Sequence, residues 1–198
     1  MSLPRNRGFS LVELMITIAV VAILTAVAWP NFRDFMHRNA VTSQANQVLA
    51  ALQYARNEAV SRRYPTALCG STSGTACTAS DTKFEGGWMI WRDSTLSGTP
   101  SYSAAKDELL RVVDAQNGVS IRSFGGSGSA SIIAFDQRGA VIGAGGGTTN
   151  VVVCAKTSSS DALGTNSPKV PGKYVRVDAS GRITVQALAA TDTCDAAP

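Results

Sequence analysis

The feature that most constrains the fold is an apolar stretch near the start of the chain. It runs for 21 residues, from Phe9 to Trp29, and Glu13 is its only charged residue. A helix of that length is about 30 Å long, which matches the hydrocarbon core of a bilayer. We therefore expect residues 9–29 to form a membrane-spanning helix, preceded by a short basic leader of residues 1–8.

The residues around this stretch indicate its orientation. Arg5 and Arg7 precede it and favour a cytoplasmic N-terminus, whereas Arg33 and Arg38 follow it and weaken the asymmetry. All four cysteines lie beyond the stretch, as expected of a part that is exported to an oxidising compartment. We expect the N-terminus to be cytoplasmic and the rest of the chain to lie outside the membrane.

A second helical pattern follows the apolar stretch. Pro30 lies at the junction, where its ring and its missing N–H predict a bend rather than an end of the helix. Residues 30–63 then carry apolar side chains at three- and four-residue steps, which predicts an amphipathic helix. These side chains belong to Val41, Ala45, Val48, Leu49, Leu52, Ala55 and Ala59. We expect this half to pack on a globular domain while the first half projects.

Glu13 is the residue that points to assembly. A carboxylate inside an apolar span costs on the order of 2 to 3 kcal/mol unless it finds a partner. Cleavage between Gly8 and Phe9 would create a positively charged amine four residues away, which the Glu13 of a neighbouring subunit could bind. The span is therefore expected to anchor the subunit first and to bundle with other subunits afterwards.

Two other interpretations of the first thirty residues remain open. Ala26-Val27-Ala28 could be a signal-peptidase site, so that residues 1–28 would be a discarded secretory signal. The chain could also be a membrane-anchored domain that never polymerises. Glu13 inside the stretch and the helical pattern beyond it argue against the first interpretation, and the second leaves Glu13 without a role.

The N-terminal motif is similar to that of a known family. The string Arg7-Gly8-Phe9-Ser10-Leu11-Val12-Glu13-Leu14, followed by Pro30, closely resembles the N-terminus of type IV pilins and type II secretion pseudopilins. The resemblance implies that a prepilin peptidase cuts after Gly8 and methylates Phe9. It also implies that Glu13 docks the subunit into a filament whose core is the kinked N-terminal helix. The protein would lie in the bacterial inner membrane before assembly, with a periplasmic head, and in the pilus or its tip afterwards.

The remainder of the chain, residues 64–198, has the residue pattern of a small β-rich domain. Short apolar or alternating runs are separated by turn residues, which predicts an antiparallel sheet packed on the amphipathic helix. The candidate strands are Thr66–Cys69, Trp88–Arg92, Glu108–Val113, Ser131–Phe135, Val151–Lys156, Tyr174–Val177 and Ile183–Ala187. The expected fold class is therefore α+β.

Two predicted hairpin turns share one chemistry. Residues 136–139 and 178–181 each begin with Asp and end with Gly, an order that suits type I turns. In the last hairpin we expect one buried face and one outer face. The buried face would hold Val175, Val177, Ile183 and Val185, and the outer face Tyr174, Arg176, Arg182 and Thr184.

The four cysteines favour two disulfides. Three pairings are possible, and we prefer Cys69 with Cys77 and Cys154 with Cys194, because each bond then closes a contiguous segment. A structural zinc site is the alternative. It is disfavoured because the chain has no Cys-x-x-Cys pair and its single histidine, His37, is distant in sequence.

The head also resembles a particular branch of the family, the GspH/FimT group. The matching segments are residues 55–63, 66–70, 87–93, 110–112, 134–139 and 181–185. This group comprises minor pilins and minor pseudopilins, which help to initiate or cap filaments. The resemblance implies a type IV pilin-like fold with a long kinked N-terminal helix on two small antiparallel sheets. It implies other minor pilins and the major pilin as partners, in a type IV pilus or a type II secretion system.

Catalysis finds little support in the sequence. His37 lies near the membrane exit, away from any serine or cysteine elbow, and we interpret it as an interfacial surface residue. The acidic pairs Asp107-Glu108 and Asp192 with Asp195 are interpreted as solvated surface charge. We expect neither an enzyme nor a cofactor or metal.

A group of basic residues near the C-terminus suggests a second function class. Lys169, Lys173, Arg176 and Arg182 could form a cationic strip that fits DNA. Some FimT-like minor pilins bind DNA through a C-terminal Gly-Arg-x-Arg element. Residues 181–184 keep only the first arginine of that element, so a DNA-binding minor pilin for natural transformation is the alternative, not the leading hypothesis. The formal net charge of +4 does not decide the matter.

Overall fold

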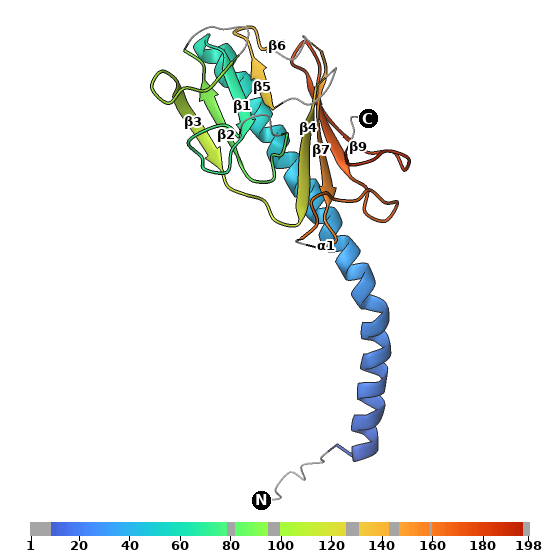
Figure 1. Cartoon of the computed structure of the whole chain (residues 1–198). Helices are drawn as coiled ribbons and strands as arrows, with labels where there is room; N and C mark the ends of the chain where they lie inside the picture. The colour runs from blue at the N-terminus through green and yellow to red at the C-terminus, as the bar shows by residue number, and fades with distance from the viewer. Residues whose placement is uncertain are drawn as a thin grey trace, which may run out of the picture. The chain divides into compact units, whose positions relative to one another are not determined.

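The computed structural model combines one long helix with two antiparallel sheets (Figure 1). It describes residues 9–78, 82–94, 100–125, 131–142, 147–158 and 160–195. The chain divides into two compact units, one ending at Met36 and the other beginning at His37. Helix α1, Leu11–Arg62, contributes to both units.

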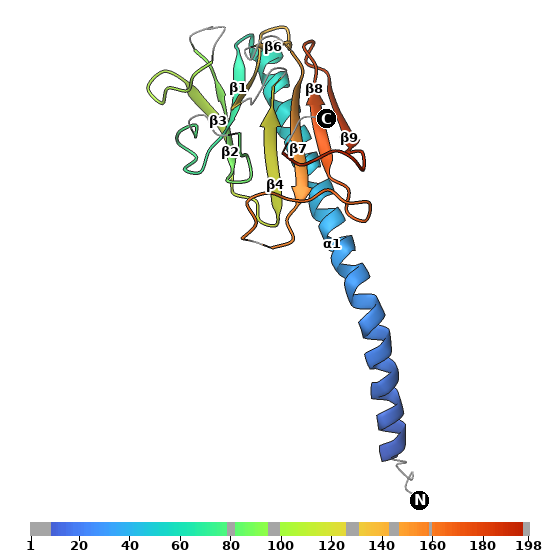
Figure 2. The same ribbon diagram turned by 45° about the vertical axis from the view of Figure 1, so that its right-hand side comes forward.

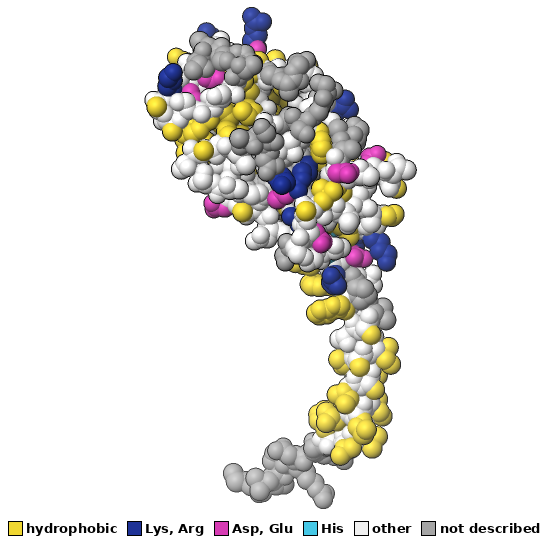
Figure 3. Space-filling model, viewed as in Figure 1, with side chains coloured by type: hydrophobic (Ala, Val, Ile, Leu, Met, Phe, Trp, Pro, Cys, Tyr) yellow, Lys and Arg dark blue, Asp and Glu magenta, His cyan; other side chains and the backbone are white. Residues whose placement is uncertain are grey.

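The first unit is an apolar helical segment. Ser10 caps its start, because the Ser10 hydroxyl accepts a hydrogen bond from the Glu13 backbone N–H at 3.2 Å. The Thr17 and Thr25 hydroxyls donate to carbonyls one turn earlier, so neither polar group needs water. Exposed hydrophobic side chains occur at nearly consecutive positions, from Leu11 and Val12 to Leu14, Met15 and Ile16, and therefore point in all directions around the helix axis. Those on one face are visible in Figure 3. By length and composition, α1 is the one helix in the described part of the chain that could span a membrane.

Helix α1 is continuous through position 30. Pro30 therefore does not end the helix, as expected from its position at the end of the apolar stretch. The bend expected at this residue stays a prediction.

In the second unit, α1 supplies one wall of the main core. Its buried side chains recur at three- and four-residue steps, which confirms the predicted amphipathic pattern. They are Val41, Ala45, Val48, Ala51, Leu52, Ala55 and Ala59. Leu49, also expected on this face, is partly buried against the same core. The helix ends at Arg62, and Arg63 takes a left-handed conformation with φ of 56°, as is common just past a helix end.

Two sheets pack on this half of the helix (Figures 1 and 2). The first has the order β3-β2-β1-β5-β6, and the second has the order β4-β7-β8-β9, with every neighbouring pair antiparallel. The strands of the first are β1 (Thr66–Gly70), β2 (Trp88–Arg92), β3 (Glu108–Val113), β5 (Ile132–Phe135) and β6 (Val141–Ile142). Those of the second are β4 (Val119–Phe124), β7 (Thr149–Ala155), β8 (Lys173–Val177) and β9 (Ile183–Ala187). The fold class is α+β, as predicted.

Alternate residues of both sheets face α1. Leu68, Ile90 and Ile133 of the first sheet and Ile121, Val153 and Val175 of the second share one buried cluster with the helix. The opposite face of each sheet has a smaller core of its own, built around Trp91 in the first and around Cys154 in the second. Tyr102 meets Trp91 edge to face, with ring centroids 5.5 Å apart.

The segment before β2 joins the two sheets. The Phe84 N–H donates to the Ile121 carbonyl at 2.9 Å, and the Ser123 N–H donates to the Thr82 carbonyl at 2.9 Å. These bonds occupy the free edge of β4, which would otherwise be open to pairing with another chain. The side chain of Phe84 is buried in the main core, which fixes the segment in place.

The sequence analysis missed two strands. It did not predict β4 or β6, although the two sheets that the family resemblance implies are present. Strand β6 is only two residues long, too short for a periodic pattern. Strand β4 carries Arg122 among its buried residues, which hides its apolar alternation.

Both predicted Asp-to-Gly turns are present. Gly139 and Gly181 have φ of 81° and 79°, values that favour glycine. In each turn the glycine N–H donates to the carbonyl of the aspartate three residues earlier. The Asp136 carboxylate accepts two backbone N–H bonds, and the Asp178 carboxylate accepts one from Arg182 at 2.9 Å.

Candidate assembly site

The N-terminal segment places an acid at the start of an apolar helix. Glu13 lies in the first turn of α1, where the helix dipole favours a negative charge, and its side chain is exposed. Within the described residues its carboxylate has neither a hydrogen-bond donor nor an ion-pair partner. Phe9 is 82% exposed, and Gly8 lies outside the described residues. The exposed Glu13 side chain is thus accessible to groups outside the described residues.

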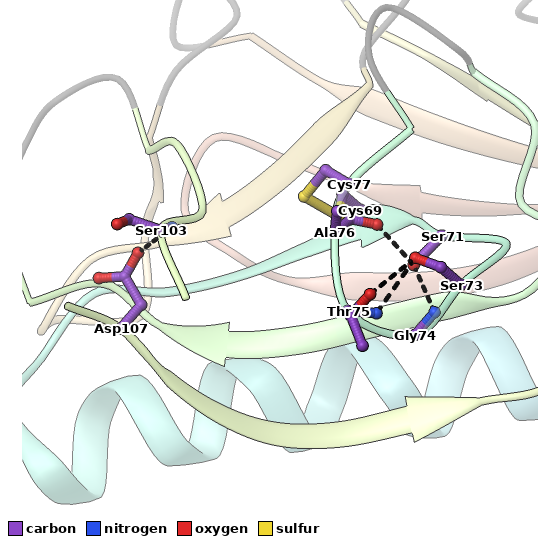
Figure 4. Close-up of a disulfide and its surroundings, with 9 residues drawn as sticks. All are labelled: Cys69, Ser71, Ser73, Gly74, Thr75, Ala76, Cys77, Ser103 and Asp107. Atoms are coloured by element: carbon purple, nitrogen blue, oxygen red, sulfur yellow. Dashed lines mark hydrogen bonds between the residues drawn. A yellow bond between two sulfur atoms is a disulfide. The ribbon is translucent and has the colours of Figure 1, made fainter. Parts of the chain in front are cut away.

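The first disulfide orders a loop on the outer face of the first sheet. Cys69 of β1 is bonded to Cys77, eight residues later. Inside the loop, the Ser71 hydroxyl donates to the Ala76 carbonyl at 2.6 Å and accepts from the Gly74 N–H at 3.0 Å (Figure 4). The loop is thus held by its own hydrogen bonds as well as by the covalent bond.

The second disulfide holds the C-terminal segment on the second sheet. Cys154 of β7 is bonded to Cys194, across 40 residues of sequence, and both are buried with Leu188. The Asn166 side-chain amide donates to the carbonyls of Ala189 and Asp192, which fixes the same segment. Both disulfides are the ones that the sequence analysis preferred, and the described residues include no free cysteine.

A buried ion cluster links the segment before β2 to the second sheet, and the sequence analysis did not find it. Glu85 pairs with Arg122 of β4, and its carboxylate also accepts the Ile121 N–H at 3.2 Å. Lys156 lies 3.9 Å from the same carboxylate, and Arg122 donates to the Ala162 carbonyl at 2.6 Å. The cluster ties together segments far apart in sequence, which no local pattern could reveal.

The basic residues near the C-terminus do not form one strip. Val175 and Val177 of β8 face the core, so Lys173 shares their side of the sheet, whereas Arg176 is exposed on the other side. Arg182 is exposed just after the turn. On the face seen in Figure 3 the Lys and Arg side chains lie apart, with Asp and Glu side chains among them. DNA binding through these residues stays a prediction from the sequence.

The acidic residues that we interpreted as surface charge also have structural roles. The Asp107 carboxylate accepts the Ser103 N–H at 2.7 Å and the Ser94 N–H at 3.0 Å (Figure 4 shows the first). The Asp192 carboxylate accepts the Ala189 N–H at 2.8 Å. His37 is half-buried. In the described segments, no three His, Cys, Asp or Glu side chains form a group that could hold a metal ion.

Comparisons with known proteins agree with this arrangement. The family model described as Type II transport protein GspH matches residues 44–181, and the prokaryotic N-terminal methylation motif matches residues 3–29. The crystal structure of the type IV minor pilin FimU from Pseudomonas aeruginosa has the same fold. Its TM-score is 0.52 at 19% identity, and the match covers 81% of this chain and 97% of that chain.

Curated relatives are pilus proteins. A fimbrial protein of Pseudomonas aeruginosa is 33% identical over 138 residues, which cover 69% of this chain and 77% of that protein. The type IV major pilin protein PilA of Myxococcus xanthus is 47% identical over 60 residues, but these span only 27% of PilA. The methylation motif implies processing by a prepilin peptidase, and the apolar helix fits a membrane-anchored pilin. The chain therefore belongs to the GspH family of type IV pilins and pseudopilins.

Proposed function

We propose that this protein is a minor pilin that helps to initiate or cap assembly of a type IV pilus. The observation that carries the proposal is Glu13, an exposed acid in the first turn of an apolar helix, on a chain whose head belongs to the GspH family. An acid in that position gains most from a positive charge supplied by another subunit. The head, stiffened by two disulfides, would select the neighbouring pilins.

The proposed sequence of events begins in the inner membrane. The apolar half of α1 anchors the precursor with a cytoplasmic leader and a periplasmic head. Cleavage after Gly8 frees the amine of Phe9, which is then methylated. Glu13 pairs with that amine on an adjacent pilin, and the apolar helices bundle in the filament core with other minor pilins and the major pilin.

Filament incorporation of Glu13 variants tests the proposal. We expect Glu13→Gln to be processed and inserted normally but to be lost from purified filaments, because the amide carries no charge. Glu13→Asp is the matched control, since it keeps the carboxylate and should retain part of the incorporation. Incorporation of Glu13→Gln at the wild-type level would contradict the proposal.

Mass spectrometry of the membrane-extracted protein tests the processing step separately. The expected N-terminus is N-methylated Phe9. An N-terminus at Trp29 would instead identify residues 1–28 as a secretory signal and would remove both the anchor and Glu13.

A minor pseudopilin of a type II secretion system is the second candidate. It is favoured by the family model, whose description refers to type II transport. Both candidates use the same helix and head, and they differ in the machine that they join. Crosslinking in cells followed by identification of the captured subunits separates them, since the captured proteins would be pilins in one case and pseudopilins in the other.

A further inference from the structure

A short aromatic face follows the apolar stretch of α1. Trp29, Phe32, Phe35 and Met36 are between 51% and 70% exposed. At 3.6 residues per turn, these four side chains fall within an arc of about 120° around the helix. Asn31, Arg33 and Asp34 fall outside this arc. The segment is therefore amphipathic, in contrast to the apolar stretch before it.

The length of the segment decides where this face can lie. Leu11 to Trp29 already extends about 28 Å as a helix, close to the roughly 30 Å of a bilayer core. Continuing to Met36 brings the length to about 39 Å. A straight helix would need a tilt of about 40° to keep that length within the core, at the upper end of the range seen for membrane helices. Such a tilt would also place Arg33 and Asp34 in hydrocarbon, which is unfavourable.

We propose that residues 30–36 lie in the plane of the outer surface of the inner membrane before assembly, with Trp29, Phe32, Phe35 and Met36 buried among the lipid acyl chains. The aromatic arc is continuous with the membrane-spanning stretch, and the exposed Arg33 faces the anionic headgroups. Tryptophan is enriched at this depth because its ring is amphipathic. This orientation requires α1 to bend near residue 30 when the protein is in the membrane, and Pro30 is where its sequence predicts a bend.

This inference rests on the membrane anchoring proposed above, but not on the role in filaments. Removing the subunit from the membrane requires extraction of the aromatic face as well as of the span. The same face would become available to neighbouring helices only after extraction.

Depth-dependent quenching of tryptophan fluorescence by brominated lipids tests the inference. The full-length mature protein is placed in phosphatidylethanolamine and phosphatidylglycerol vesicles that contain lipids brominated at shallow, middle or deep acyl positions. Trp29 reports on the end of the span. Trp88 and Trp91 are buried in the head, and a Trp29→Phe variant measures their background. Two further variants are made in that background to introduce a single tryptophan probe. Phe35→Trp places the probe on the aromatic arc, and Asp34→Trp places it outside the arc on the same helical turn.

We expect Trp29 and the probe at position 35 to report the same shallow depth, and the probe at position 34 to be quenched several-fold more weakly. A helix that continues straight out of the membrane would place position 35 about 9 Å farther from the bilayer centre than Trp29, beyond the quenchers. That result would overturn the inference, as would equal quenching at positions 34 and 35, which would indicate a straight tilted helix. Quenching at position 35 that changes with the protein-to-lipid ratio would assign the arc to a second copy of the chain and would also overturn it. Absence of quenching at Trp29 would reject the anchoring itself.

Discussion

Gly181 lies directly against the backbone carbonyl of Gly139, so the hairpin turn of one sheet packs on the turn of the other. The Arg56 Nε of α1 donates to the same carbonyl at 3.0 Å, and the Val141 N–H donates to the Ala179 carbonyl at 3.1 Å. Both glycines have positive φ, which most other residues adopt only with strain. This contact and the segment before β2 join the two sheets at different places.

Substitution of Gly181 should therefore destabilise the head more than its backbone conformation alone would predict. A β-carbon at Gly181 would collide with the Gly139 carbonyl, which the Arg56 hydrogen bond holds in place. Gly118 is the matched control, because its φ is 78° but a β-carbon there meets nothing within 4 Å. We expect Gly118→Ala to lower the unfolding free energy by about 1 kcal/mol from strain, and Gly181→Ala by about 2 kcal/mol more from overpacking. Denaturant unfolding in detergent, followed by tryptophan fluorescence, measures both unfolding free energies. Equal losses of unfolding free energy in the two variants would show that the two turns are not in tight contact.

Removal of the Glu85 carboxylate should be costly because it leaves buried cations without a counter-charge. The side chains of Glu85 and Arg122 are only 14% and 10% exposed, and Lys156 is also close. We expect Glu85→Gln to lower the unfolding free energy by about 3 kcal/mol. Glu108→Gln is the control, since Glu108 pairs with Arg92 at 3.0 Å but is 46% exposed, and its loss should cost less than about 1 kcal/mol. If Glu85→Gln lowered the unfolding free energy no more than Glu108→Gln does, water would have to reach the ion cluster.

The two disulfides should differ in their contribution to stability. In the chain-entropy model, a loop of 40 residues restricts the unfolded chain by about 4 kcal/mol and a loop of eight by about 2.5 kcal/mol. We expect the double variant Cys154→Ser with Cys194→Ser to lose more stability than Cys69→Ser with Cys77→Ser. The two double variants and the wild type, compared by denaturant midpoint and slope, check the order. The reverse order would show that the hydrogen bonds of Ser71 and its neighbours depend on the Cys69–Cys77 disulfide, which closes the shorter loop.

The parts of the fold that the sequence predicted are those with a local pattern. The helix follows from the spacing of Val41, Ala45 and Val48, and the last hairpin follows from Asp178, Gly181 and the alternation around them. What could not be predicted depends on contacts distant in sequence. Arg122 is buried in β4 only because Glu85 lies beside it, 37 residues away in the chain.

The same distinction holds for the candidate site. Glu13 could be singled out because it is the one charge in an apolar run, and its pairing with another subunit still awaits experiment. The positions of the basic residues could be predicted only in part, because strand geometry places Lys173 and Arg176 on opposite sides of β8. DNA binding through these residues stays a prediction.

The turn at Asp178 should make stability depend on pH. The Ser180 hydroxyl and the Arg182 N–H donate to the Asp178 carboxylate, and these hydrogen bonds lower its pKa in the folded protein below the usual value. A carboxylate whose pKa is lower in the folded state stabilises the fold above the unfolded-state pKa, and that stabilisation is lost as the pH falls through the folded-state value. We therefore expect the wild-type unfolding free energy to fall more steeply than that of Asp178→Asn as the pH decreases from about 5 to about 2.

Asn at position 178 can still accept the turn hydrogen bonds, so the two proteins should have similar stability near neutral pH. Asp114→Asn is the control, because the Asp114 carboxylate makes no hydrogen bond to the described residues and its side chain is exposed. Its pH profile should follow that of the wild type. Parallel pH profiles for the wild type and Asp178→Asn would mean that the Ser180 and Arg182 hydrogen bonds stabilise the protonated Asp178 as strongly as its carboxylate. The turn would then contribute no pH dependence to the stability of the head.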